Sequence, residues 1–158
     1  MNVEAKRLLA FYPVLYVSAF SLNFCWESWH GLLYVAHQGL PASVYVPMMV
    51  QMALLDAISV IGMHLFTAFF ARKFVWRPAG RHLVVFCLAG ALPAWAVEFA
   101  SVNLLHLWSY TGAMPMLFRV GMSPLLQLPL TGLAGIVVAR AVAGYDRIRD
   151  EPFSRTYF

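Results

Sequence analysis

Three acidic residues lie inside long apolar stretches of the chain, where a charge is costly. Glu27, Asp56 and Glu98 are each surrounded by Leu, Phe, Val, Ala and Trp, and no Lys or Arg lies deep in any of these stretches. At bilayer depth a carboxyl group must face the bundle interior or water, pair with a donor, or hold a proton. Three acids on three segments therefore predict a shared interior site, and we take them as candidate catalytic acids or bases.

Further polar residues follow the first of these acids at helical spacing. Tyr16, Asn23, Glu27, His30 and Tyr34 are separated by seven, four, three and four residues, which places them on one helix face. Aromatic and amide residues also flank the acids on other segments. The candidate ligand-binding residues are Asn23, His30, Asn103, His106, Trp26, Trp95, Trp108 and Tyr110.

The chemistry that suits this set is acid–base catalysis on an apolar substrate. A carboxylic acid among aromatic side chains can protonate an alkene, and Trp and Tyr faces stabilise cations. Isoprenoid, carotenoid and sterol conversions use such an environment. Glu27 and His30 form a Glu-x-x-His motif of the kind found in di-iron bundles, but a second motif is missing, so no metal site is predicted and the cofactor stays unknown.

Ordinary structural roles compete with these interpretations. Trp108 and Tyr110 are also typical of the aromatic belt at a membrane interface. Asn23 and Gln127 also fit hydrogen bonds that bridge helices, worth about 1 kcal/mol each in membranes. For His64, a lone histidine in an apolar stretch, we expect a hydrogen-bonded packing role in preference to a ligand-binding role.

The composition indicates the elements that position these residues. Hydrophobic residues make up 61% of the 158 residues and charged residues only 11%, which excludes a soluble domain. Four apolar stretches, about 8–36, 43–71, 82–108 and 122–144, are each long enough to cross a bilayer, and lipid requires them to be helical. The sequence predicts an all-α polytopic membrane protein, a four-transmembrane-helix bundle in one domain, 1–158, with a cytoplasmic tail at 146–158.

The basic residues predict the orientation of the bundle. Of the 11 Lys and Arg residues, all but Arg119 fall on the side of the two termini. The positive-inside rule places both termini in the cytoplasm, with the chain in the bacterial inner membrane. Glu27 and Glu98 then lie in the non-cytoplasmic half, with Asp56 nearer the middle. The basic surplus records orientation, and no nucleic-acid partner is predicted.

A set of motifs runs along most of the chain. It comprises Trp26-Glu27, Asp56, Glu98, Trp108-Ser109-Tyr110, Met114-Pro115 and Gly121-Met122-Ser123-Pro124-Leu125-Leu126-Gln127. This set resembles an uncharacterised family of small bacterial four-helix integral membrane proteins. The resemblance implies four helices and a role for the three intramembrane acids, but no particular reaction.

Two weaker similarities concern shorter segments. Trp108-x-Tyr110, a glycine-containing loop and Pro124-Leu125 are similar to the membrane lycopene-cyclase type of carotenoid protein. In that family acidic residues follow the proline; this chain has none there, so Glu27 or Glu98 would have to substitute. Trp26-Glu27 with His30 is similar to sterol-isomerase-like four-helix proteins.

The sequence thus predicts a carboxylate and histidine pocket that binds or modifies a hydrophobic ligand, either a lipid or an isoprenoid or carotenoid-like molecule. Two alternatives stay open at this point: a non-catalytic subunit of a larger membrane complex, and a proton or ion conduit. The predicted partners are membrane lipids, a hydrophobic small molecule, and a second copy or another membrane protein.

Overall fold

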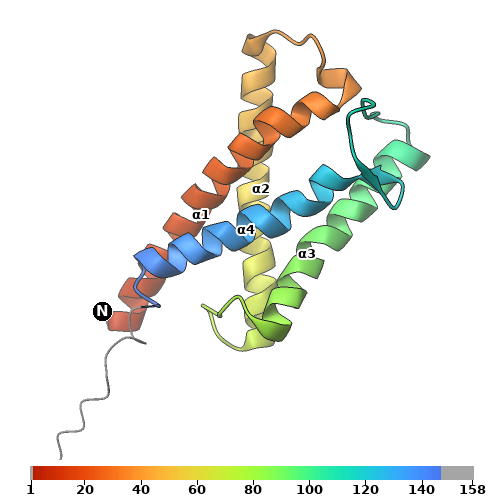
Figure 1. The fold of residues 1–158 in the computed structure, drawn as a ribbon. Helices are drawn as coiled ribbons and strands as arrows, with labels where there is room; N and C mark the ends of the chain where they lie inside the picture. The colour runs from red at the N-terminus through yellow and green to blue at the C-terminus, as the bar shows by residue number, and fades with distance from the viewer. Residues whose placement is uncertain (1, 147–158) are drawn as a thin grey trace, which may run out of the picture.

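The computed structural model describes residues 2–146, which fold into a bundle of four long helices (Figure 1). These are α1 (Val3–His30), α2 (Ala42–Ala71), α3 (Gly80–Phe99) and α4 (Met122–Val142). With short continuations of α1 and α3, all four are long and apolar enough to cross a membrane. This confirms the prediction of an all-α, multi-pass membrane protein. Residues 147–158 of the expected tail lie outside the described residues.

The first helix differs from the expected 8–36 at both ends. It begins at Val3 because the Asn2 side chain accepts a hydrogen bond from the Ala5 backbone N–H, at 2.8 Å, and so caps the helix. The α-helical part ends at His30 and continues as two 3₁₀ turns, η1 (Gly31–Leu33) and η2 (Val35–His37). This segment leaves the helix because its backbone pairs with a distant loop: Val35 donates to Ser109 and Thr111 donates to Leu33.

The third helix also ends before its expected boundary at 108. Its α-helical part stops at Phe99, and a π-helical turn, η3 (Ala100–Leu104), follows. The chain then reverses through His106, which has a positive φ of 53°, and Leu107 donates a backbone hydrogen bond back to Ser101. Residues 105–108 therefore belong to the connection, where the short antiparallel strands β1 (Met116–Leu117) and β2 (Val120–Gly121) form a hairpin before α4.

The bundle has an apolar half and a polar half. α1 packs against α2 and α4, and α3 packs against α4 and α2. The apolar core lies in the half that holds the start of α1 and the end of α4 and includes the fully buried Phe11, Leu15, Val60, Phe86 and Ile136. The buried acids lie in the other half, toward the connections α1–α2 and α3–α4. The fold thus separates a dry packed region from a hydrogen-bonded one.

Small residues on α4 allow the helices to approach closely in the apolar core. A Cβ atom on Gly132 would lie 2.7 Å from Cζ of Phe86 and 3.3 Å from Cγ1 of Val60. Phe86 and Val60 are fully buried, so neither can move aside without disturbing the core. In membranes, where packing rather than water drives helix association, such contacts carry much of the stability.

We expect the substitution Gly132→Ala to destabilise the bundle by about 1–3 kcal/mol, because the added methyl group overpacks the core against Phe86. The matched control is Gly62→Ala on α2, where a Cβ meets no atom within 4 Å. That change removes a helix glycine at no steric cost and is expected to be neutral or stabilising by up to about 1 kcal/mol. Unfolding in mild detergent, followed by circular dichroism, measures both. Equal stability of the two variants would contradict the packing argument.

Candidate functional site

The side-chain amide of Gln127 on α4 joins two of the three intramembrane acids. Its Nε2 atom lies 2.6 Å from Oε1 of Glu27 on α1 and 2.6 Å from Oδ2 of Asp56 on α2. The amide has two N–H groups, one for each carboxyl group. Three helices therefore meet at a single polar contact, and Glu27 and Asp56 are brought together as the sequence predicted.

A second polar layer lies one helical turn away on α1 and α4. The Asn23 side chain, fully buried, accepts from Thr131 Oγ1 at 3.0 Å and lies 3.2 Å from the Gln127 amide. Asn23 precedes Glu27 by four residues, and Thr131 follows Gln127 by four, so each helix presents its two polar residues on one face. This pairing fixes the register of α1 against α4 around the acids.

The third acid, Glu98 near the end of α3, is held by three donors from the connections. Tyr34 donates to its Oε1 atom at 3.0 Å, Trp108 Nε1 donates to Oε2 at 3.2 Å, and the Tyr110 hydroxyl also donates to Oε2. The backbone pairing of residues 33–35 with 109–111 brings the two tyrosines to the same carboxyl group. Three donors occupy most of the acceptor positions of a carboxylate.

The two tyrosines keep their protons and act as donors. Burial, together with the neighbouring Glu98, raises the pKa of Tyr34 and of Tyr110 well above the ordinary value. An ionised phenol beside a carboxylate would bring two negative charges together in a poorly solvated place. The phenolic protons therefore remain available to Glu98 across the physiological pH range.

His30 lies between the two groups of acids. Its Nε2 atom is 3.4 Å from the Tyr34 hydroxyl, and its Nδ1 atom is 3.7 Å from Oε2 of Glu27. The ring is buried, and Nδ1 has no hydrogen-bond partner within the described residues. Contacts thus run from Asp56 through Gln127, Glu27, His30 and Tyr34 to Glu98, and the longest step is the one between Glu27 and His30. We call this series of side chains the carboxylate network.

Several predicted ligand-binding residues lie beside the network or outside it. Trp26 is adjacent, because its Nε1 atom donates to Ser123 Oγ at 3.1 Å and so ties α1 to the start of α4. Trp95 and Asn103 instead donate to the carbonyls of Phe118 and Arg119, at 3.3 and 3.1 Å, and anchor the β1–β2 hairpin. His106 is exposed at the chain reversal. The prediction that Asn103 and His106 extend the site assumed an α-helix to residue 108, which the π-helical turn and the reversal interrupt.

Two residues of the network, Tyr34 and Gln127, and the neighbouring Thr131 are not among the site residues predicted from the sequence. Tyr34 lies on the predicted polar face of the first helix, but its partner Glu98 is 64 residues away. The sequence predicts for Gln127 only a bridge between helices and assigns no role to Thr131. An amide within an apolar run carries the same kind of signal as an acid, because both need a polar partner in lipid.

The network holds its acids without Lys or Arg partners among the described residues. Among residues 2–146 no Lys or Arg forms an ion pair with Glu27, Asp56 or Glu98. The only ion-pair contact of these three acids within those residues is the 3.7 Å approach of His30 to Glu27. Within the same residues no group of three or more His, Cys, Asp or Glu side chains has an arrangement that could hold a metal ion. The side chains present can hold and pass protons through carboxyl, imidazole and phenol groups.

The buried His64 lies apart from this site, in the apolar half. Its Nε2 atom contacts the carbonyl of Phe74 at 2.9 Å, and its ring stacks on Trp76 with 5.4 Å between centroids. Its surroundings are those of a packing residue that fixes the α2–α3 connection.

No protein-family model matches this chain, and neither does any curated protein or solved structure.

We expect Gln127→Leu to destabilise the protein by about 1–3 kcal/mol, because it leaves Glu27, Asp56 and Asn23 without a shared donor in a buried place. The matched control is Gln51→Leu, the same change at an exposed position of α2. Thermal unfolding of both variants in one detergent gives the comparison. A Gln127→Leu variant as stable as Gln51→Leu would show that the amide does not hold the three helices together.

Proposed function

We propose that this chain is a multi-pass protein of the bacterial inner membrane that binds a hydrophobic ligand of the lipid or isoprenoid class at the carboxylate network. The single observation that carries the proposal is that three intramembrane acids belong to one network of contacts and have no Lys or Arg ion pair among the described residues. Acids at bilayer depth are costly to keep, so their gathering at one place favours a function over a packing role.

The two parts of the network suit different steps of acid–base chemistry. Glu98 accepts from three donors, which fix its carboxyl group where it can stabilise positive charge on a ligand. Glu27 and Asp56 both lie 2.6 Å from the Gln127 nitrogen, which holds the two carboxyl groups close enough to act together on a ligand. The Glu27–Asp56 pair and Glu98 are connected through His30 and Tyr34.

Access to the network supports a ligand that arrives from the lipid or from the outer surface. Asp56, Trp108 and Tyr110 are only half-buried, whereas Glu27 and Glu98 are buried. The indole and phenol rings offer apolar and π-rich faces at this edge, which suit an alkene or a developing cation. The side toward the termini is blocked by the apolar core of Leu15, Val60 and Phe86. A network that is half-buried at its ends and bounded by an apolar core favours chemistry on a bound ligand over a proton conduit.

We expect Glu27→Gln and Glu98→Gln to lower the amount of co-purified hydrophobic ligand about tenfold or more, because each removes a charge-assisted contact worth roughly 1.5–3 kcal/mol. The control is Glu4→Gln, a glutamate at the first turn of α1 outside the network. Mass spectrometry of organic extracts of protein purified in mild detergent measures the ligand.

Two results of this experiment would overturn the proposal. Ligand content unchanged in both network variants would remove the acids from the site. A stoichiometric protein partner that survives both substitutions, with no enriched small molecule, would instead support the subunit alternative.

The orientation is tested separately with cysteine labelling. In a chain with Cys25 and Cys87 replaced by Ala, we expect Gly112→Cys to react with a membrane-impermeant maleimide on spheroplasts, and Ala79→Cys to react only after the membrane is opened. Gly112 has open space around its Cβ position, and Ala79 is exposed in the α2–α3 connection. The expectation follows from the basic residues on the side of the termini. The reverse labelling pattern would contradict cytoplasmic termini.

A further inference from the structure

A cavity lined by cations lies at the end of the bundle nearest the termini. It has a volume of about 520 Å³, within the range of about 300–1,000 Å³ that is usual for small-molecule sites. The α2–α3 connection, the first turn of α3 and the end of α4 form it. Its basic lining residues are Lys73, Arg77, Arg81 and Arg140. We call it the basic cavity.

The charge of this cavity is largely uncompensated by the described residues. Between residues 2 and 146, Asp146 is the only acid in an ion pair with any of the four cations, at 2.6 Å from Arg140. The first turn of α3 adds open backbone N–H groups, since its N-cap residue Ala79 has no side-chain capping bond. The positive-inside rule requires cations on this side, but it does not require them to gather around one cavity. Their gathering favours an anionic ligand.

The wall of the basic cavity is fixed by hydrogen bonds. The buried Trp76 donates its indole N–H to the carbonyl of His64 at 3.2 Å and stacks on the ring of His64. The carbonyl of Trp76 in turn accepts from Nη1 of Arg140 at 2.9 Å. One guanidinium is therefore held in place by the same residues that fix the α2–α3 connection, which is the preorganisation that a binding site needs.

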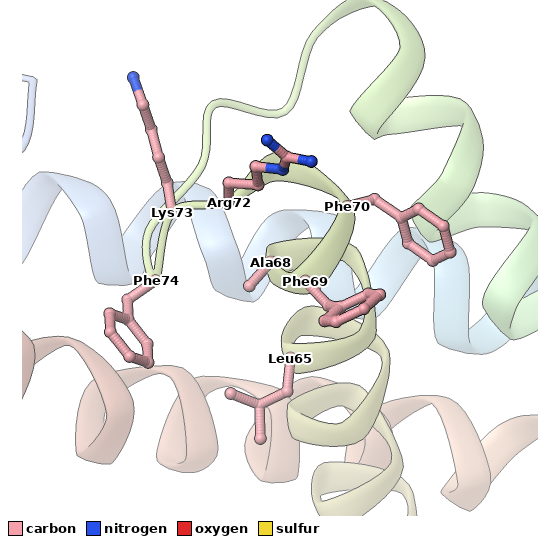
Figure 2. Close-up of a pocket in the computed structure, with 7 residues that line it drawn as sticks. All are labelled: Leu65, Ala68, Phe69, Phe70, Arg72, Lys73 and Phe74. Carbon is pink, nitrogen blue, oxygen red and sulfur yellow. The ribbon is translucent and has the colours of Figure 1, made fainter.

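An apolar groove adjoins the basic cavity and shares Lys73 with it. This groove, of about 710 Å³, is lined by Leu65, Ala68, Phe69, Phe70, Arg72, Lys73 and Phe74 (Figure 2). In Figure 2 the charged ends of Arg72 and Lys73 point away from the body of α2, whereas Leu65 and Phe69 lie along the helix. Phe69 is 78% exposed. The combined surface has a cationic part next to an apolar part, which is the complement of an amphiphile with an anionic head.

We propose that the basic cavity and the apolar groove together bind an anionic phospholipid. Its phosphate lies against Arg77 and Arg81, whose planar guanidinium groups offer paired donors that match phosphate oxygens. Its acyl chain lies along Leu65 and Phe69 on α2. The site is at the end of two spanning helices, where headgroups of the same leaflet are available. It is far from the carboxylate network along α2 and does not depend on the function proposed for that network.

The test uses the full chain in detergent micelles with two probes, phosphatidylglycerol and phosphatidylcholine, and counts bound lipids by native mass spectrometry. We expect phosphatidylglycerol to bind in preference, and Arg77→Gln or Arg81→Gln to weaken its binding about tenfold while leaving phosphatidylcholine unchanged. The matched control is Lys6→Gln, which removes one positive charge at the same end of the bundle outside the cavity lining.

Further variants separate the possible results. Phe69→Ser is expected to weaken lipid binding, and Arg77→Lys to restore part of the affinity lost in Arg77→Gln, which a misfolded variant would not do. Equal binding of the two lipids, or an equal loss in Lys6→Gln, would overturn the proposal in favour of general surface attraction. Displacement of the lipid by millimolar glycerol phosphate or inorganic phosphate would overturn it in favour of a site for a soluble phosphate.

Discussion

The contact of the Gln127 amide with Glu27 and Asp56 is the constraint on which the arrangement of this bundle depends. Apolar faces alone specify helix packing weakly in lipid, because lipid tails are as apolar as Leu or Phe. A buried carboxyl group specifies helix packing more strongly, because it is stable only where a hydrogen-bond donor lies next to it. The 2.6 Å contacts of one amide with two acids therefore fix three helices at one level. One turn away, the hydrogen bond from Thr131 to Asn23 holds α4 and α1 in the same register, next to the glycines of α4.

The connections between the helices supply the hydrogen-bond donors of the third acid. Glu98 belongs to α3, the helix that makes no hydrogen bond to the Gln127 amide. Its three donors, Tyr34, Trp108 and Tyr110, lie in the connections between the helices. Those residues reach it because backbone hydrogen bonds join residues 33–35 to 109–111. The π-helical turn and the positive φ at His106 turn the chain back over the acid. The irregular backbone is thus the means by which one carboxyl group receives three partners.

The sequence predicted the four helices and the gathering of the acids better than it predicted the helix ends and the residues next to the acids. Four spans follow from hydrophobicity and length, and the convergence of Glu27, Asp56 and Glu98 follows from the cost of acids in lipid. Helix ends depend instead on contacts between distant segments, such as Val35 with Ser109, which no local pattern reveals. The sequence therefore predicts one α-helix through Asn103 and His106, whereas the α-helical part of α3 ends at Phe99. Tyr34 and Gln127 carried a detectable signal, a polar group in an apolar run, but it did not identify their partners.

The distribution of charge in this chain determines how the intramembrane acids can be balanced. Lys and Arg side chains gather around the cavity near the start of α3 and the end of α4, whereas among the described residues no Lys or Arg forms an ion pair with the three acids of the other half. A Lys or Arg among the acids would neutralise them permanently and hold them in fixed ion pairs. Without one, the negative charge can be balanced only by protons, by donors such as Tyr34 and Gln127, or by a bound group. Protons and bound groups are exchangeable where an internal cation is not, so the lack of a Lys or Arg partner among the described residues leaves the network free to exchange the groups that balance its acids.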